Sequence, residues 1–275
     1  MAGLERQDRP AQVFPPPPGA ATVQVLTNER FVKSRGRLGH IATLLGFATL
    51  IVGLYLTWQQ PEMALYAYVT LVPGFLLISY GNYTTIRWGT HPRVDEALGI
   101  ALKSLDNKYQ LFNYVKGLPT DNLLLTPSGL VVIEVRPYFG AFENKGGRWK
   151  RKRNLSGWLL MLGEGGLGNP SRDIQHGVKT VTDFLTTSLG GEDAAQIPVE
   201  GVVVFTHPRA VLTVDNPEVP VVAVKDLKPE VRRLRAQGRL NTDLYRRLAR
   251  VLHGTLGETG ARSGSGSERA GRVTS

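Results

Sequence analysis

The chain has 275 residues, enough for one or two domains, and a formal net charge of +10 at pH 7. It contains no cysteine, which excludes disulfides, thiolate metal sites and a cysteine nucleophile. The positive charge favours an anionic partner, either a lipid surface or a nucleic acid, and charge alone does not separate the two.

Residues 1–37 are expected to form a flexible N-terminal arm. They contain the proline run Pro15–Pro18 and little apolar periodicity, a composition typical of segments without a packed core. The arm ends in a group of cations just before the first apolar run: Arg30, Lys33, Arg35 and Arg37.

Two apolar runs, at about 39–58 and 63–83, predict a transmembrane helical hairpin over residues 38–88. No Asp, Glu, Lys or Arg occurs between Leu38 and Pro61, and the first run is long enough to cross a bilayer as a helix. Only a short turn separates the runs, so both outer ends lie on the same side. The alternative interpretation is a helical hairpin buried in a soluble core.

The flanking charges predict the orientation of this hairpin. Cations precede the first run, Arg87 and Arg93 follow the second, and the turn between the runs has no Lys or Arg. By the positive-inside rule both termini are cytoplasmic. The sequence therefore predicts a multi-pass protein of the cell membrane, with the lipid bilayer as one partner.

Residues 90–255 are expected to form a cytosolic domain, and residues 256–275, rich in Ser and Gly, a disordered tail. The order of elements predicts an α/β fold with a mixed sheet flanked by helices. In chain order they are a helix at 94–105, a strand at 109–115, hairpins at 121–136 and 140–151, a helix at 170–185, strands at 199–206, 211–214 and 219–224, and helices at 226–237 and 241–253.

Two carboxylates are predicted to meet across the first hairpin. Its turn, Thr126–Gly129, has proline at the second position and glycine at the fourth, which is typical of a tight turn. If Thr126 pairs with Gly129, then Asp121 falls opposite Glu134, and like charges in that position are destabilising. A divalent cation such as Mg²⁺ would convert this pair into a binding site. The alternative is a strand end whose acids are simply solvated.

Arg136 lies two residues after Glu134 and therefore on the same face of the strand. Its guanidinium can stabilise phosphate charge, but it stays protonated and cannot act as a general base. It can equally pair with Asp121 or Glu134, neutralise them and displace a metal.

The second hairpin carries a basic run interrupted by a tryptophan. Such a run can follow a nucleic-acid backbone while the indole stacks on bases, or it can lie on anionic lipid headgroups. The tryptophan can also simply pack in the core. The candidate nucleic-acid-binding residues are Lys145, Arg148, Trp149, Lys150, Arg151, Lys152 and Arg153.

Residues 121–140 resemble the nuclease-related domain (NERD), a branch of the PD-(D/E)xK nuclease-like superfamily. In that family an aspartate begins a strand, a Thr-Pro-x-Gly-like turn follows, and Ile-Glu-x-Lys ends the next strand ahead of an aromatic residue and a glycine. The resemblance extends over about 90–206 and includes Trp149, which matches a family tryptophan after the second hairpin. Arg136 occupies the position of the family lysine.

Glu96 and the helix start at Asn169 also match the family pattern, each with a departure from it. Glu96 stands where the family has a glutamate on its first helix, but the helical count places it away from the apolar stripe. Asn169, Pro170 and Gln175 resemble the start of a family helix, with a longer spacing than usual.

The resemblance implies a PD-(D/E)xK nuclease-like fold and phosphodiester hydrolysis with Mg²⁺ or Mn²⁺ held by Asp121 and Glu134. The implied catalytic set adds Arg136, Glu96 and Gln175, and the implied substrate is DNA or RNA. The competing hypothesis is a degenerate nuclease fold that acts as a membrane-tethered binding or scaffold module. Arg136 is the residue that distinguishes the two.

Overall fold

The computed structural model describes residues 22–59, 64–88, 92–152, 167–235 and 238–264. Within these ranges the strands form a six-stranded sheet in the order β1-β2-β3-β4-β7-β9 and a three-stranded sheet in the order β6-β5-β8. The larger sheet contains β1 (Gln24–Thr27), β2 (Gln110–Asn113), β3 (Asn122–Thr126), β4 (Gly129–Arg136), β7 (Val199–Phe205) and β9 (Val221–Ala223). The smaller contains β5 (Gly140–Lys145), β6 (Arg148–Lys152) and β8 (Ala210–Asp215).

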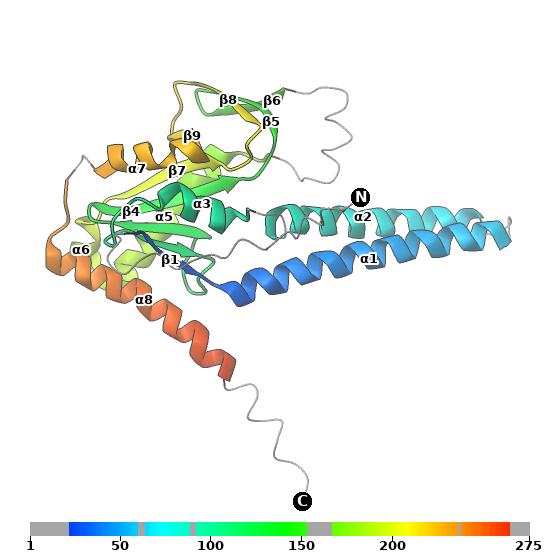
Figure 1. Ribbon diagram of the computed structural model, residues 1–275, viewed down its shortest axis with the longest axis horizontal. Coiled ribbons are helices and arrows are strands. Elements are labelled where there is room, and N and C mark those ends of the chain that lie inside the picture. Colours follow the sequence, from blue (N-terminus) through cyan, green and yellow to red (C-terminus); the bar gives the residue numbers. More distant parts are fainter. Residues whose placement is uncertain (1–21, 60–63, 89–91, 153–166, 236–237, 265–275) are drawn as a thin grey trace, which may run out of the picture.

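Helices cover both faces of the larger sheet (Figure 1). The helices are α1 (Glu29–Gln59), α2 (Ala64–Trp88), α3 (Val94–Leu102), α5 (Pro170–Leu189), α6 (Gly191–Ala195), α7 (Leu227–Arg235) and α8 (Thr242–Gly264), with a short 3-10 turn, η2 (Val224–Asp226). The elements confirm the predicted mixed sheet flanked by helices.

The sequence of the central strands explains why both faces are covered. In β3 and β4 consecutive residues are apolar, so each strand presents a hydrophobic side chain to both faces. Leu123 and Leu125 pack in one core with α5 and α8, whereas Leu124 packs in a second core with α3 and α7. The pairing is mixed because β2, β3 and β4 are antiparallel, whereas β1, β7 and β9 join in parallel.

The N-terminal arm is shorter than predicted. Residues 24–27 form β1, which pairs in parallel with β2 at the edge of the sheet, and α1 begins at Glu29 after a cap in which the Asn28 side chain accepts a hydrogen bond from the Phe31 amide (3.2 Å). A four-residue strand was missed because it gains its stability from pairing with β2 rather than from a pattern of its own. The rest of the arm, residues 1–21, lies outside the described residues.

The C-terminal tail also begins later than predicted, because α8 continues to Gly264. The disordered tail predicted from residue 256 therefore overlaps the end of this helix, and residues 265–275 lie outside the described part of the chain.

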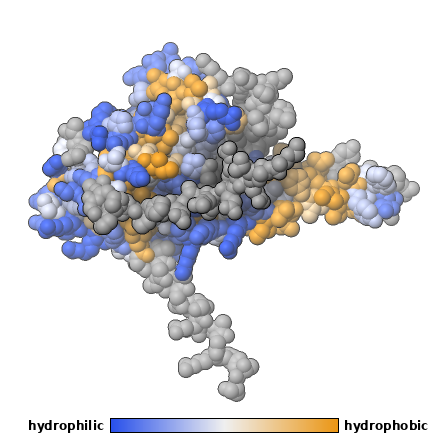
Figure 2. All heavy atoms as spheres, viewed as in Figure 1, coloured by the Kyte–Doolittle hydropathy of each residue, from blue (hydrophilic) through white to orange (hydrophobic). Residues whose placement is uncertain are grey.

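Helices α1 and α2 pack side by side and project from the domain as a long hairpin whose surface is strongly hydrophobic (Figures 1 and 2). Leu44 and Leu54 on α1, and Val72 and Leu76 on α2, are among the exposed apolar side chains. Among the described residues one helix, α1, is long and apolar enough to cross a membrane.

The second predicted span corresponds to α2. The side chains of residues 64–68 and the turn at 60–63 lie outside the described residues, and α1 is the one span that the described residues support. The two-span anchor therefore stays a prediction.

Glycines allow the two helices to approach closely. A Cβ atom added to Gly46 would lie 2.8 Å from the carbonyl oxygen of Gly74, and one added to Gly81 would lie 2.7 Å from that of Gly39. Close packing through small residues is typical of helix pairs in membranes.

Candidate functional site

The first hairpin has the predicted register. Thr126 pairs with Gly129 and Leu123 with Val132, and the Thr126 hydroxyl stabilises the turn by donating to the carbonyl of Gly129 (3.0 Å). The last pair between β3 and β4 is Leu123 with Val132, so Asp121 lies two residues beyond this ladder rather than opposite Glu134 within it. Asp121 and Glu134 nevertheless line the same small pocket.

Asp121 forms an ion pair with Arg87, the penultimate residue of α2, with 2.5 Å between the guanidinium and the carboxylate. The Asp121 side chain is 53% exposed, so water weakens this pair. Arg87 also lines the pocket beside Glu134. Arg87 of α2 therefore pairs with Asp121 and lies in the same pocket as Glu134.

Arg136 joins Glu134 to a third acid. Its guanidinium forms ion pairs with Glu134 and, at 2.5 Å, with Asp173 in the first turn of α5. It also donates to the carbonyl oxygens of Leu167 and Val135, each at 3.3 Å. The Arg136 side chain is only 11% exposed, and its donors are directed at these oxygens. The predicted pairing of Arg136 with Glu134 is present in the structure.

Burial and neighbouring charge act on Glu134 in opposite directions. Burial raises the pKa of the Glu134 carboxyl above its ordinary value, and Arg136 opposes this rise without cancelling it. The Glu134 carboxylate is therefore poorly solvated, and Arg136 is the main group that stabilises its charge.

Glu96 has a structural role at the start of α3. Its carboxylate accepts a hydrogen bond from the Arg93 amide (2.9 Å), which is the return half of a capping box. It is not among the residues that line the pocket of Asp121 and Glu134. The buried acid of this helix is its neighbour Asp95, which takes two hydrogen bonds from the Arg93 guanidinium, at 3.2 and 2.9 Å.

Asp95 and Tyr114 were missed by the sequence reasoning. Tyr114 lines the same pocket as Asp121, its amide donates to the Asp121 carbonyl (2.7 Å), and burial raises the pKa of its hydroxyl. Its ring packs between Phe31 of α1 and Trp88 of α2. A buried charge one position from Glu96 was detectable from the helical periodicity, whereas the tertiary contacts of Tyr114 were not.

Gln175 lies away from the acid pair. Its side-chain amide donates to Glu218 (3.2 Å), on the segment that follows β8. Asn169 caps α5 as predicted, because its side chain accepts from the Arg172 amide (3.3 Å). The acid that α5 brings to Glu134 and Arg136 is Asp173, two residues before Gln175.

The acid pair does not offer the ligand set of a divalent metal site. Among the described residues no group of three or more His, Cys, Asp or Glu side chains is close enough to hold a metal ion. Asp121 and Glu134 each already have a guanidinium as counter-ion. The predicted Mg²⁺ or Mn²⁺ site therefore does not fit the side chains in this arrangement.

The basic run of the second hairpin divides between two faces. Lys145 pairs with Arg148, and Glu143 pairs with Lys150, across β5 and β6. Paired residues and residues two apart share a face, so Lys145, Arg148 and Lys150 lie together on the outer face. All three cations are exposed. Arg151 turns inward, where it donates to the Phe139 carbonyl (2.7 Å) and lies over the Phe142 ring. Arg153 and the side chain of Lys152 lie outside the described residues.

Trp149 is a packing residue. It faces inward against Phe205 of β7, with ring centroids 5.8 Å apart, and its indole donates to the Ser171 hydroxyl (2.8 Å). These contacts correspond to the packing role, one of the two roles that the sequence predicts for this tryptophan.

Apart from Arg87 of α2, the acids and arginines of this site lie between the cap of α3 and the end of β7. Residues 93–206 match the family model of the nuclease-related domain, NERD. The match contains the first hairpin, the second hairpin and α5, and it supports a nuclease-like fold for this region. Strands β8 and β9 and helices α7 and α8 follow it, and α1 and α2 precede it. No curated protein and no solved structure matches the chain.

Proposed function

We propose that this chain is a membrane-tethered NERD-related module that binds nucleic acid without cutting it. The observation that carries the proposal is the double ion pair of Arg136 with Glu134 and Asp173. A metal-dependent nuclease needs free carboxylate oxygens at this place, and here the oxygens face an arginine that stays protonated at any physiological pH.

The negative charge of Asp121 is compensated by an arginine of the helical hairpin formed by α1 and α2. Arg87 pairs with Asp121, so a metal ion that used both acids would have to displace two guanidinium groups. Arginine also cannot take a proton from water, which removes the group most suited to activate a nucleophile. Both effects favour a binding role over hydrolysis.

The outer face of the β6-β5-β8 sheet is the candidate surface for nucleic acid. Lys145, Arg148 and Lys150 are exposed there, Glu143 and Asp215 are acids beside them, and the Glu218 carboxylate lies against Gly147 in the turn of the same hairpin. The Lys145 ammonium lies 3.9 Å from Asp215, a weak contact at an exposed site. Cations without an aromatic platform favour contacts to the phosphate backbone, which are independent of base sequence.

The hairpin supplies the tether. In this proposal α1 and α2 cross the membrane together and both chain termini stay in the cytoplasm, as the flanking cations predict. Support comes from the exposed leucines on α1 and from the glycine contacts between the helices. Tyr114, Phe31 and Trp88 join the domain to the base of the hairpin.

The binding proposal is tested on the full chain in detergent micelles with labelled single- and double-stranded DNA and RNA. We expect binding that weakens with salt and that Arg148→Gln and Lys150→Gln each reduce. Lys103→Gln, an exposed lysine at the end of α3, is the matched control and should leave affinity unchanged.

Anionic lipid is the competing partner for the same cations. Vesicles that contain phosphatidylserine are therefore included in the same series. Binding to these vesicles with no salt-sensitive binding to any nucleic acid would contradict the proposal.

A further inference from the structure

A pocket of about 380 Å³ lies at the end of the sheet opposite to the acid pair. It forms where the loop before β2, the β3–β4 turn and the start of α8 meet. Glu134 and Asp121 lie at the other end of the same hairpin, beside α2. The lining residues are Asp106, Lys108, Pro127, Arg239, Leu240, Thr242, Tyr245 and Arg246.

Hydrogen bonds between its walls fix the shape of this pocket. The Leu240 amide donates to the Pro127 carbonyl (2.9 Å), and the Tyr245 hydroxyl donates to the Lys108 carbonyl (2.7 Å). The Lys108 amide in turn donates to the Asp106 carboxylate (3.0 Å). Three segments far apart in the sequence are thereby held together around one opening.

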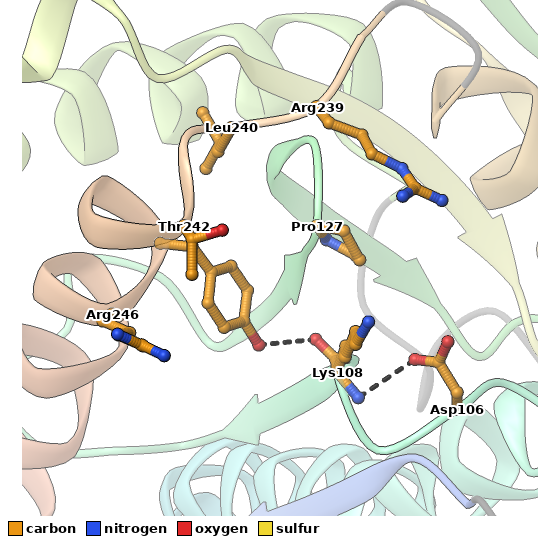
Figure 3. A pocket seen from close by; sticks show the side chains of 8 residues that line it. Asp106, Lys108, Pro127, Arg239, Leu240, Thr242 and Arg246 are labelled. Carbon is orange, nitrogen blue, oxygen red and sulfur yellow. Dashed lines mark hydrogen bonds between the residues drawn. The ribbon is translucent and has the colours of Figure 1, made fainter.

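The charge of the pocket is positive. Lys108, Arg239 and Arg246 line it, and Asp106 is the acid among the lining residues, which leaves an excess of two positive charges. Figure 3 shows Lys108 on the loop before β2, and Arg239 and Arg246 on the segment at the start of α8, on different sides of the pocket. Arg246 has a distant contact to Asp243 (3.8 Å), which is too long and exposed to neutralise it. An excess of this size matches the charge of about −1.5 to −2 on a phosphate monoester at pH 7.

The remaining lining is apolar or aromatic. Pro127, Leu240 and the Tyr245 ring contribute it, and Leu240 and Tyr245 also pack against the core that lies below α8. Burial and the nearby Asp106 raise the pKa of the Tyr245 hydroxyl, so it stays protonated and keeps its bond to Lys108. A volume in this range fits a small organic ligand, and a rigid ring fits a proline and a tyrosine surface.

We propose that this pocket binds a small organic phosphate with a planar ring, of the size of a nucleoside monophosphate. The phosphate lies among Lys108, Arg239 and Arg246, and the ring lies on Pro127 and Tyr245. The proposal does not depend on nucleic-acid binding, because its residues are separate from those of the β6-β5-β8 face.

The position of the pocket favours a soluble phosphate over a lipid headgroup as its ligand. The hairpin leaves the domain at the end of the sheet that carries Asp121, and the pocket lies at the end that carries Pro127. An eight-residue strand such as β4 spans about 25 Å between them. A membrane around α1 and α2 is therefore on the far side of the domain.

The test is calorimetric titration of the full chain in detergent micelles with AMP, CMP, GMP and UMP. Adenosine carries the ring without the phosphate, and glycerol 3-phosphate and inorganic phosphate carry the phosphate without the ring. We expect saturable binding of at least one monophosphate, about tenfold tighter than any of these three probes.

Substitutions locate the binding. Lys108→Gln and Arg239→Gln, both at exposed positions, should each weaken it about tenfold, because each removes one charge-assisted hydrogen bond. Arg232→Gln, an exposed arginine on α7, should leave it unchanged. Thermal unfolding of each variant confirms that it is folded.

Three outcomes would overturn the proposal. The first is no saturable binding of any monophosphate at millimolar concentration. The second is equal affinity in wild type, Lys108→Gln and Arg239→Gln. The third is glycerol 3-phosphate or inorganic phosphate binding as tightly as the best monophosphate, which would reassign the pocket to a headgroup or a simple anion.

Discussion

The guanidinium of Arg136 forms an ion pair with the carboxylate of Glu134, which lies two residues earlier on the same face of β4. The same guanidinium reaches Asp173 on α5, so one side chain links a strand and a helix through two acids. A lysine at this position would be a single point charge, whereas the planar fork of arginine can bridge two carboxylates. Arg136 thereby makes the two acids part of an internal salt-bridge network.

Removing the Arg136 guanidinium should destabilise the domain. In Arg136→Gln the Glu134 and Asp173 carboxylates lose the guanidinium that pairs with both, and we expect a loss of about 2 kcal/mol in the free energy of unfolding, below the usual cost of a buried pair because Asp173 is half-exposed. Thermal and chemical unfolding of the full chain in micelles measures it. The double variant Glu134→Gln with Arg136→Gln should recover part of the loss, and additive losses would contradict the pairing.

Glu134 should make stability depend on pH. Its folded-state pKa is raised by burial, so the folded chain holds this proton more tightly than the unfolded chain. Its contribution is fully present below the unfolded pKa of about 4.3 and is lost as pH rises through the folded pKa. Relative to Glu134→Gln, wild type should therefore lose unfolding free energy as pH rises across this window. A difference that does not change with pH, or that changes in the opposite direction, would refute the assignment.

The helical hairpin should be sensitive to a single methyl group at its contact. Gly46→Ala places a Cβ atom 2.8 Å from the Gly74 carbonyl oxygen, and overpacking of this kind costs about 1–3 kcal/mol. Gly36→Ala is the matched control, because its Cβ atom would lie 3.8 Å from the nearest atom. Thermal unfolding in micelles should separate the two variants. Equal melting temperatures would show that α1 and α2 do not pack as described.

The absence of cysteine allows a direct test of membrane topology. Gln59→Cys lies at the exposed tip of α1, and Asn107→Cys lies in the exposed loop before β2. In intact cells an impermeant maleimide should label Gln59→Cys and not Asn107→Cys, and permeabilised cells should show both labels. Labelling of Asn107→Cys in intact cells would contradict a cytoplasmic domain.

Local sequence rules predicted the elements that carry their own signals. The Thr126–Gly129 turn fixed the register of β3 and β4, and the side chains of Asn169 and Pro170 fixed the start of α5. Those signals act within a few residues, so they are readable from the chain alone.

Ion-pair partners that come from distant elements could not be predicted from the sequence in this way. Arg136 had a candidate partner on its own strand, Glu134, but Asp173 comes from a helix that begins 34 residues later. Arg87 of α2 reaches Asp121 in the domain because β1 and the packing of Tyr114 hold the hairpin against the sheet. Such contacts depend on how elements dock, and the periodicity of any one element does not encode them.

Because Glu134 and Asp121 are each paired with an arginine, we expect the acid pair not to hydrolyse phosphodiesters. The most direct measurement is cleavage of labelled single- and double-stranded DNA and RNA by the full chain in micelles, with Mg²⁺ or Mn²⁺, beside the Glu134→Ala variant. We predict that wild type gives no more product than Glu134→Ala on any substrate. Metal-dependent cleavage by wild type that Glu134→Ala abolishes would contradict the proposed binding role without hydrolysis.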